Sequence, residues 1–308
     1  MKPGRRLNLL RKFGFKIFAA DFCASNIRLP KLTARYKDRV LIDWLREHYG
    51  HVINDYLHKE SHTEQQDSSP CIWSMWWQGE DNLPEVVNLC FEKIRKHCGS
   101  HKFIIITKDN YRNYIDLPEY IFRKIDDGKI TLTHFSDIIR MYLLSHYGGM
   151  WIDSTVLVTK NIPEEIFSMD YYTIKRGFDL REYHAAMLRW CACVQFARKG
   201  CLLCDFVVKV LLEYWKDNDS LVDYVLIDYV IALGYECLPE CRAMIDAVPQ
   251  SNYAFDDVMH LLNAEWDADV FSELAKDTQF FKLTYKHTFS KAKREKDTFY
   301  GHFIKAQK

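Results

Sequence analysis

The spacing of apolar residues along the chain separates predicted helices from predicted strands. Residues 32–59 carry apolar side chains at a helical period, which predicts a helix or a helix pair. Mostly apolar segments at 72–77 and 103–107 predict buried strands. Between them, Pro84 marks the start of a predicted helix at 84–98. This strand, helix and strand form a βαβ unit, which predicts parallel strands with ligand-binding loops at their carboxyl ends.

A second helix and strand follow in the middle of the chain. Thr133 is the predicted N-cap of a helix that ends near Tyr147, because Gly148 and Gly149 stop it. The apolar run at 150–159 then predicts one strand. Two further helices are predicted at 201–216 and 220–233.

The first 40 residues are unusually basic. They hold eleven Lys or Arg against two Asp, although the whole chain has a net charge of zero. Leucines and phenylalanines lie between these cations, a mixture typical of a segment that lies on an anionic membrane surface. A basic helix packed on the protein body is the alternative. The apolar runs are shorter than the roughly 20 residues that span a bilayer, and the neutral total charge argues against nucleic acid as a partner. We therefore expect a cytoplasmic protein, peripheral on the inner face of the plasma membrane.

Composition also divides the chain. Residues 60–70 are polar and have the composition of a linker, which predicts a basic helical extension with linker at 1–70 and an α/β domain at 71–308. The ten cysteines are expected to be reduced thiols. A structural zinc site is the alternative for one group of four: Cys191, Cys193, Cys201 and Cys204.

Three charged residues stand in apolar surroundings in the middle of the chain. Asp137 and Arg140 are three residues apart and share one face of the predicted helix, which points toward Asp153 if the glycines make a tight turn. Carboxylates bind sugar hydroxyls and arginine binds phosphate or hydroxyl oxygens, so the three suit a sugar diphosphate. The alternative is an ion pair that only orients the helix, with Asp153 capping a turn.

These residues belong to a series of motifs that resembles a known family. The series comprises Trp77-Gln78-Gly79, the helix start at Pro84, Ser136-Asp137-x-x-Arg140 and Gly148-Gly149-x-Trp151-x-Asp153. Over residues 72–166 the chain resembles the capsular polysaccharide synthesis proteins and the wider sugar transferases of glycosyltransferase family 32. The resemblance implies a GT-A-like α/β fold, with a Rossmann-type mixed sheet flanked by helices and preceded here by the helical extension.

The resemblance also implies roles for individual residues. Asp137, Arg140 and Asp153 are the expected catalytic residues, with Asp137 and Arg140 on the donor sugar and Asp153 at the ribose or metal site. Trp76 or Trp77 is expected to stack on the base, and the pattern does not separate them. The predicted donor-binding residues are Trp76, Trp77, Gln78, Ser136, Gly149, Trp151, Thr155 and His287.

The family motif implies Mn²⁺ or Mg²⁺, but this chain departs from it. Thr155 stands where the wider family has a second carboxylate, and a hydroxyl is a weaker ligand for a hard cation. Asp153 and His287 are the candidate metal ligands, and the sequence leaves open whether a metal is required. Basic groups are the alternative that would offset the diphosphate charge: Lys282, Lys286, His287 and His302.

The expected activity is transfer of a hexose or N-acetylhexosamine from a nucleotide diphosphate, with UDP favoured, to a glycan acceptor that is lipid-linked. The resemblance implies retention of configuration and a place in bacterial capsular or other cell-surface polysaccharide synthesis. Asp223, Tyr224 and Asp228 are candidate acceptor-binding residues, or else they cap and pack helices. The alternatives are a catalytically inactive GT-A-fold protein that binds glycans or nucleotides, and a phosphoryl-transfer enzyme. Neither a P-loop nor a Gly-x-Gly-x-x-Gly motif occurs.

Overall fold

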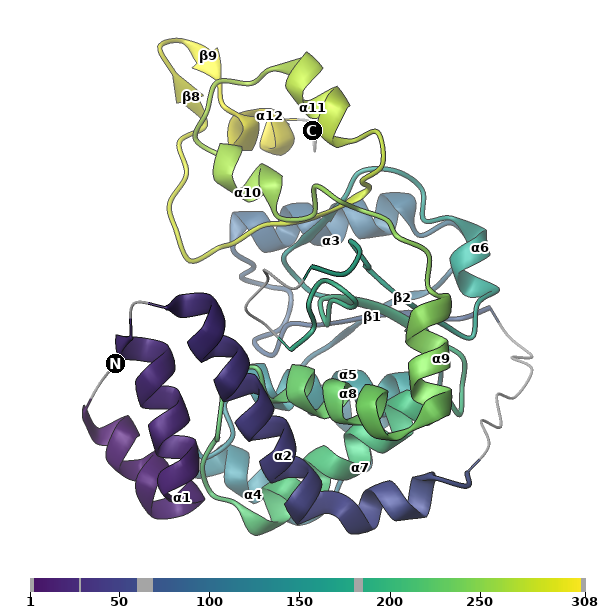
Figure 1. The fold of residues 1–308 in the computed structure, drawn as a ribbon. Coiled ribbons are helices and arrows are strands. Elements are labelled where there is room, and N and C mark those ends of the chain that lie inside the picture. Colours follow the sequence, from purple (N-terminus) through teal and green to yellow (C-terminus); the bar gives the residue numbers. More distant parts are fainter. Residues whose placement is uncertain (1–2, 28, 60–68, 180–184, 306–308) are drawn as a thin grey trace.

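A five-stranded mixed sheet lies at the centre of the protein, where Figure 1 labels β1 and β2. The strand order is β2-β1-β3-β6-β5. The computed structural model describes residues 3–27, 29–59, 69–179 and 185–305, so most of the predicted linker at 60–70 lies outside the described residues. β1 pairs in parallel with β2 and β3, whereas β6 runs antiparallel to β3 and β5. The strands are β1 (Ile72–Met75), β2 (Phe103–Ile106), β3 (Gly149–Ile152), β5 (Tyr171–Thr173) and β6 (Val194–Ala197).

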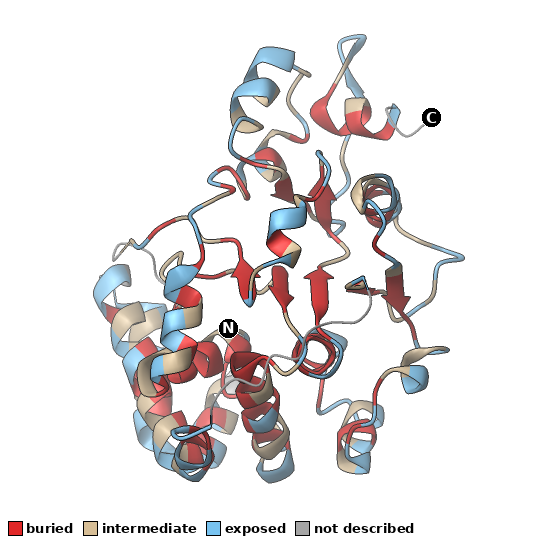
Figure 2. Cartoon of the chain, turned by 90° about the vertical axis from the view of Figure 1, so that its right-hand side faces the viewer, coloured by how far each residue is buried: buried red, intermediate tan, exposed pale blue. Residues whose placement is uncertain are grey.

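The predicted βαβ unit is confirmed. α3 (Glu85–His97) begins directly after Pro84 and connects the parallel strands β1 and β2. Nearly all residues of the central sheet are buried (Figure 2), which explains why its strands are mostly apolar. α3 covers one face of the sheet, and α5 (Leu132–His146), α7 (Leu202–Asp217) and α8 (Leu226–Cys237) lie on the other side (Figure 1). The predicted fold class, a mixed α/β sheet flanked by helices with helices at the amino terminus, is confirmed.

Two predicted boundaries in the middle of the chain are wrong. The N-cap of α5 is Thr131 and not Thr133, because the Thr131 side chain accepts a hydrogen bond from the backbone N–H of His134. The single strand predicted at 150–159 is two strands, β3 and β4 (Val156–Val158), which belong to different sheets. A turn closed by Val156 N–H and Asp153 C=O separates them, and it places Asp153 at the carboxyl end of β3.

The carboxyl-terminal part of the chain forms a smaller layer next to α3. Its strand β7 (Phe280–Lys282) pairs antiparallel with β4, and this register places Lys282 opposite Val156. A separate apolar cluster, which includes Leu157, Phe281 and Phe299, holds this layer together. Thr298 stands at the start of the last helix, where its Oγ1 accepts the backbone N–H of Gly301. The other elements of the layer are α10 (Asp257–Leu261), α11 (Ala268–Leu274), β8 (Ala292–Lys293), β9 (Lys296–Asp297) and α12 (Phe299–Lys305).

Two long helices form the amino-terminal part, as the sequence predicts. α1 (Pro3–Asn26) is kinked at Gly14, and α2 (Pro30–Tyr56) at Tyr49. α1 packs on α2, which in turn packs on α7 and α8, and their buried residues belong to the same apolar core as the sheet. The remaining elements are the 3₁₀ helix η1 (Tyr111–Asn113), α4 (Glu119–Asp126), α6 (Glu164–Phe167) and α9 (Pro239–Ala247).

Candidate functional site

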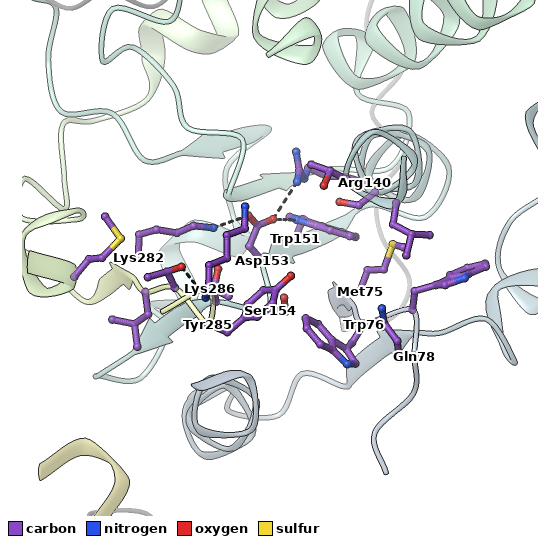
Figure 3. A pocket seen from close by; sticks show the side chains of 18 of the residues that line it. Met75, Trp76, Gln78, Arg140, Trp151, Asp153, Ser154, Lys282, Tyr285 and Lys286 are labelled. Atoms are coloured by element: carbon purple, nitrogen blue, oxygen red, sulfur yellow. Dashed lines mark hydrogen bonds and ion pairs between the residues drawn. The ribbon is translucent and has the colours of Figure 1, made fainter. Parts of the chain in front are cut away.

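A cavity of about 480 Å³ lies at the carboxyl ends of β1 and β3. Four segments that are distant in sequence line it: the loop after β1, the start of α5, the turn after β3, and the chain from Lys282 to Lys286. Figure 3 shows Trp76, Arg140, Asp153 and Lys282 around this cavity. This is the edge of the sheet at which the βαβ unit predicts ligand binding.

Asp153 is the centre of a charged network in this cavity (Figure 3). Its Oδ1 accepts hydrogen bonds from Arg140 Nη2 at 3.0 Å and from Trp151 Nε1 at 2.8 Å. Its Oδ2 accepts one from Lys282 Nζ at 2.9 Å. Arg140 also donates through Nη1 to Asp137 Oδ1 at 2.9 Å. The carboxylate, guanidinium and second carboxylate therefore converge, as the spacing of the motifs predicts.

The network fixes the charges of its members. Burial by itself would raise the pKa of Asp153, but the neighbouring Lys282 and Arg140 hold that pKa well below its usual range. Burial would likewise lower the pKa of Lys282, and the charge of Asp153 raises it instead. Asp137 differs, because burial raises its pKa to about 7 although Arg140 acts in the opposite direction. Asp153 and Lys282 are therefore both charged at neutral pH.

Aromatic side chains form one wall of the cavity. Trp76 meets Tyr285 edge to face, with ring centroids 5.3 Å apart, and both line the cavity. Trp77 packs against Tyr111 and Phe135, with centroids 5.1 Å and 5.3 Å apart. Both tryptophans pack on the core and line the cavity, but their ring partners differ, since Trp76 meets the exposed Tyr285 and Trp77 meets Tyr111 and the buried Phe135.

Nine of the predicted site residues line this cavity. They are Trp76, Trp77, Gln78, Ser136, Arg140, Trp151, Asp153, Thr155 and Tyr224. Asp137 lies directly behind Arg140. Residues that also line the cavity but were not predicted include Met75, Leu132, Ser154 and Met259. Their sequence positions carry no signal of binding, apart from the place of Ser154 between Asp153 and Thr155.

The other predicted donor and acceptor residues lie outside the cavity lining. Asp223 pairs with Lys37 of α2 at 2.6 Å, and Asp228 accepts a hydrogen bond from Trp190 Nε1 at 3.0 Å. Each contact joins a helix to a loop, which agrees with the alternative that these residues pack helices. His287 is exposed next to Phe289, whereas its neighbour Lys286 lines the cavity.

Gly149 has a structural place inside β3. A Cβ at this position would lie 2.3 Å from the carbonyl oxygen of Cys71 and 2.9 Å from Nε1 of Trp73, and the backbone φ is +100°. The carbonyl of Cys71 accepts the N–H of Met150, which aligns β3 with β1. The glycine permits this close approach of backbones. It acts on the site only through the position of β3, and not by lining the cavity.

The basic residues near the carboxyl end fall into two groups. Lys282 and Lys286 line the cavity. His302 stacks instead on Trp266, with ring centroids 3.6 Å apart, in the carboxyl-terminal layer. The lysines are therefore the basic groups that can meet a diphosphate here.

The donor set does not fit a divalent cation. Protein N–H groups occupy both oxygens of Asp153, Thr155 offers a neutral hydroxyl, and His287 is absent from the lining. In the part of the chain that the structure describes, no three His, Cys, Asp or Glu residues are grouped to hold a metal. The same finding contradicts the zinc hypothesis for Cys191, Cys193, Cys201 and Cys204, all of which are free thiols.

Several known proteins are similar to this chain. Among curated proteins, the O-glycosyltransferase PaGT of Phomopsis amygdali is 22% identical over 113 residues, which are 34% of this chain. The chain spans only 28% of that relative's length. Among solved structures, the bifunctional glycosyltransferase WbbM has 11% identity and a TM-score of 0.41, covering 78% of this chain and 50% of that one. The PaToxG glycosyltransferase has 12% identity and a TM-score of 0.39, covering 68% and 83%.

The family model has the widest coverage among these matches. Its description is "Capsular polysaccharide synthesis protein", and it matches residues 24–303. The match begins within α1 and ends within α12, so it includes the whole cavity. With most of its length matched, the chain belongs to the capsular polysaccharide synthesis protein family.

Proposed function

We propose that this protein is a glycosyltransferase that moves a hexose or N-acetylhexosamine from a nucleotide diphosphate, with UDP favoured, to a glycan acceptor. The observation that carries the proposal is the convergence of Arg140, Asp153 and Lys282 at a cavity with an aromatic wall. Carboxylates suit sugar hydroxyls, cations suit a diphosphate and a flat ring suits a base. Family membership supports a role for this reaction in the synthesis of a capsular or other cell-surface polysaccharide.

The geometry suggests an orientation for the donor. The base would lie against Trp76 and Tyr285, the diphosphate near Lys282 and Lys286, and the sugar toward Arg140. Asp137 would then act by holding Arg140 rather than by touching the sugar, since it lies behind the guanidinium.

We further propose transfer with retention by a front-face reaction. The diphosphate leaves while the acceptor hydroxyl arrives on the same face of the sugar, so no enzyme nucleophile is required. Charge develops on the departing phosphate oxygen, and fixed cations in a water-poor site stabilise such charge most effectively. Lys282 suits this role because its neighbour Asp153 keeps it protonated.

For the acceptor we propose Tyr224 as the contact. Its side chain is 56% exposed and lines the cavity next to the start of α5. An aromatic face of this kind can stack on an acceptor sugar. Asp223 and Asp228 are not included, because their carboxylates bind Lys37 and Trp190.

A donor panel tests the proposed function. We expect the purified protein to release nucleotide from a UDP-sugar faster than from a GDP-sugar. Trp76→Ala should raise KM for that donor about tenfold, because base stacking contributes roughly 1–3 kcal/mol. Trp76→Phe, which retains a ring, should recover most of the affinity. Absence of both turnover and nucleotide binding for every donor would refute the proposal. Binding without turnover would instead favour the inactive binding protein suggested by Thr155.

Membrane attachment is a separate part of the proposal. Leu7, Leu10, Phe15 and Phe22 of α1 are exposed, and the rings of Phe15, Phe18 and Phe22 follow one another along the helix. Three exposed cations lie on the same helix: Arg11, Lys12 and Lys16. This combination suits an anionic lipid surface, where a lipid-linked acceptor would be found. Within the described residues, no helix is both long and apolar enough to cross a bilayer.

Vesicle sedimentation tests this surface. We expect binding to vesicles that contain an anionic lipid and little binding to neutral vesicles. Changing Arg11, Lys12 and Lys16 to Gln should reduce binding at least tenfold, since each cation near the surface contributes about 1 kcal/mol. The matched control changes Lys96, Lys108 and Lys293, three exposed lysines elsewhere, to Gln. Equal loss in both triple variants would contradict a specific role for α1.

A further inference from the structure

The network around Asp153 has a feature that the family motif does not imply. The motif leads one to expect a cation beside Asp153, yet the oxygen facing the carboxyl-terminal layer already receives the ammonium of Lys282 at 2.9 Å. The other oxygen receives Arg140 and Trp151. The whole carboxylate is therefore engaged by donors from the protein itself.

Lys282 is built into this position by the backbone. It lies on β7, opposite Val156 of β4, so the strand that follows the Asp153 turn fixes its register. The backbone N–H of Lys282 donates to Phe255 C=O at 2.7 Å, and that of Leu283 donates to Thr155 C=O at 2.8 Å. Its side chain is 24% exposed and lines the cavity. An ammonium held in this way is preorganised like a bound ion.

The side chains of the network supply positive charge at the cavity without a metal. Arg140 and Lys282 contribute two cations against the charged carboxylate of Asp153, while Asp137, whose pKa is raised to about 7, is only partly ionised at neutral pH. Lys286 adds a further positive charge at the cavity wall. An ammonium has three N–H donors, and among the described residues Lys282 donates one hydrogen bond, to Asp153, leaving donors for phosphate oxygens. In the same part of the chain, Oδ2 of Asp153 accepts only that one hydrogen bond, but a divalent cation bound there would lie next to the ammonium of Lys282, and the two positive charges would repel each other.

We propose that Lys282, with Lys286, takes the place of the divalent cation, so that this family member binds the donor diphosphate and transfers its sugar without a metal. The inference rests on the proposed function. In the reaction, the bond from the sugar C1 to the phosphate oxygen breaks and its electron pair stays on the nucleoside diphosphate. The acceptor oxygen forms the new bond to C1 and passes its proton to that phosphate oxygen. Lys282 remains protonated and holds the leaving group.

The first test compares wild-type protein in EDTA and in Mn²⁺. We expect donor turnover in EDTA to stay within about twofold of that in Mn²⁺, and calorimetry should give the same UDP affinity in both. Loss of turnover in EDTA with recovery in Mn²⁺ would overturn this inference and leave the glycosyltransferase function intact. Absence of turnover and binding under every condition would instead remove the proposed function, and the inference with it.

Variants of Lys282 give the second test. Lys282→Ala should lower kcat/KM about 10²- to 10³-fold and weaken UDP binding, while uridine, which lacks the diphosphate, should bind as before. Lys282→Arg retains a cation and should recover part of both, and Lys293→Ala, an exposed lysine outside the site, is the control. Equal loss of UDP and uridine binding, or unchanged turnover in Lys282→Ala, would contradict the assignment. Lys282→Gln, closer in size to lysine, repeats the measurement if the alanine variant does not fold.

Discussion

Arg140→Ala is expected to lower the free energy of unfolding by about 3–5 kcal/mol, because it leaves the buried carboxylate of Asp137 without its partner and removes one of the two cations that pair with Asp153. Arg140 is 4% exposed and bridges Asp137 and Asp153 at 2.9 Å and 3.0 Å. Donor turnover should fall by at least about 10²-fold as the network loses its shape. Chemical denaturation and donor hydrolysis measure the two effects. Arg140→Lys should recover only part of each, since an ammonium lacks the planar fork that bridges two carboxylates.

Arg95 provides a matched control for this variant. It also pairs with two carboxylates, Glu80 and Glu92, but its side chain is 40% exposed. Exposed ion pairs are screened by water and contribute less than about 1 kcal/mol. The free energy of unfolding of Arg95→Ala should therefore be close to that of the wild type, and its donor turnover should be unchanged. Similar losses in both variants would mean that burial of the Arg140 network is not the source of its effect.

The second large effect is expected at the glycine inside β3. Gly149→Ala should cost about 3–5 kcal/mol of unfolding free energy, because it adds strain at a positive φ to a severe overlap. The new methyl group would lie 2.3 Å from the carbonyl oxygen of Cys71, which is backbone and cannot rotate away. Since Asp153 directly follows β3, any variant that folds should also bind donor more weakly. Denaturant unfolding monitored by tryptophan fluorescence gives the first quantity.

Gly128 provides a control that separates the effect of backbone strain at a positive φ from the effect of steric overlap. Its φ is +69°, also in the left-handed region, but a Cβ there would meet nothing within 4 Å. Gly128→Ala should therefore cost only about 1 kcal/mol. If Gly149→Ala were no more costly than Gly128→Ala, the close approach of β3 to β1 would not explain the glycine. A loss of donor affinity without loss of stability would instead support the predicted role of Gly149 in donor binding.

Local pattern alone determined much of this protein. The apolar runs at 72–77 and 103–107 predicted the parallel strands, because a strand buried on both faces needs apolar residues throughout. The three-residue spacing of Asp137 and Arg140 placed them on one helical face, and the short link through two glycines brought Asp153 to them. Each of these predictions depends on residues that are close in sequence.

Tertiary structure decided the parts that depend on distant segments. The pairing of β4 with β7 brings Lys282 to Asp153 across 129 residues, and no local pattern encodes that contact. The tertiary structure also divides residues 150–159 into two strands, since β3 belongs to the central sheet and β4 pairs with β7. Trp76 and Trp77 have the same chemistry, and only the structure shows that Trp76 meets Tyr285 of the remote segment 282–286 whereas Trp77 meets Phe135 of α5. Local spacing fixes which face a side chain occupies, but the packing of remote elements fixes what meets it there.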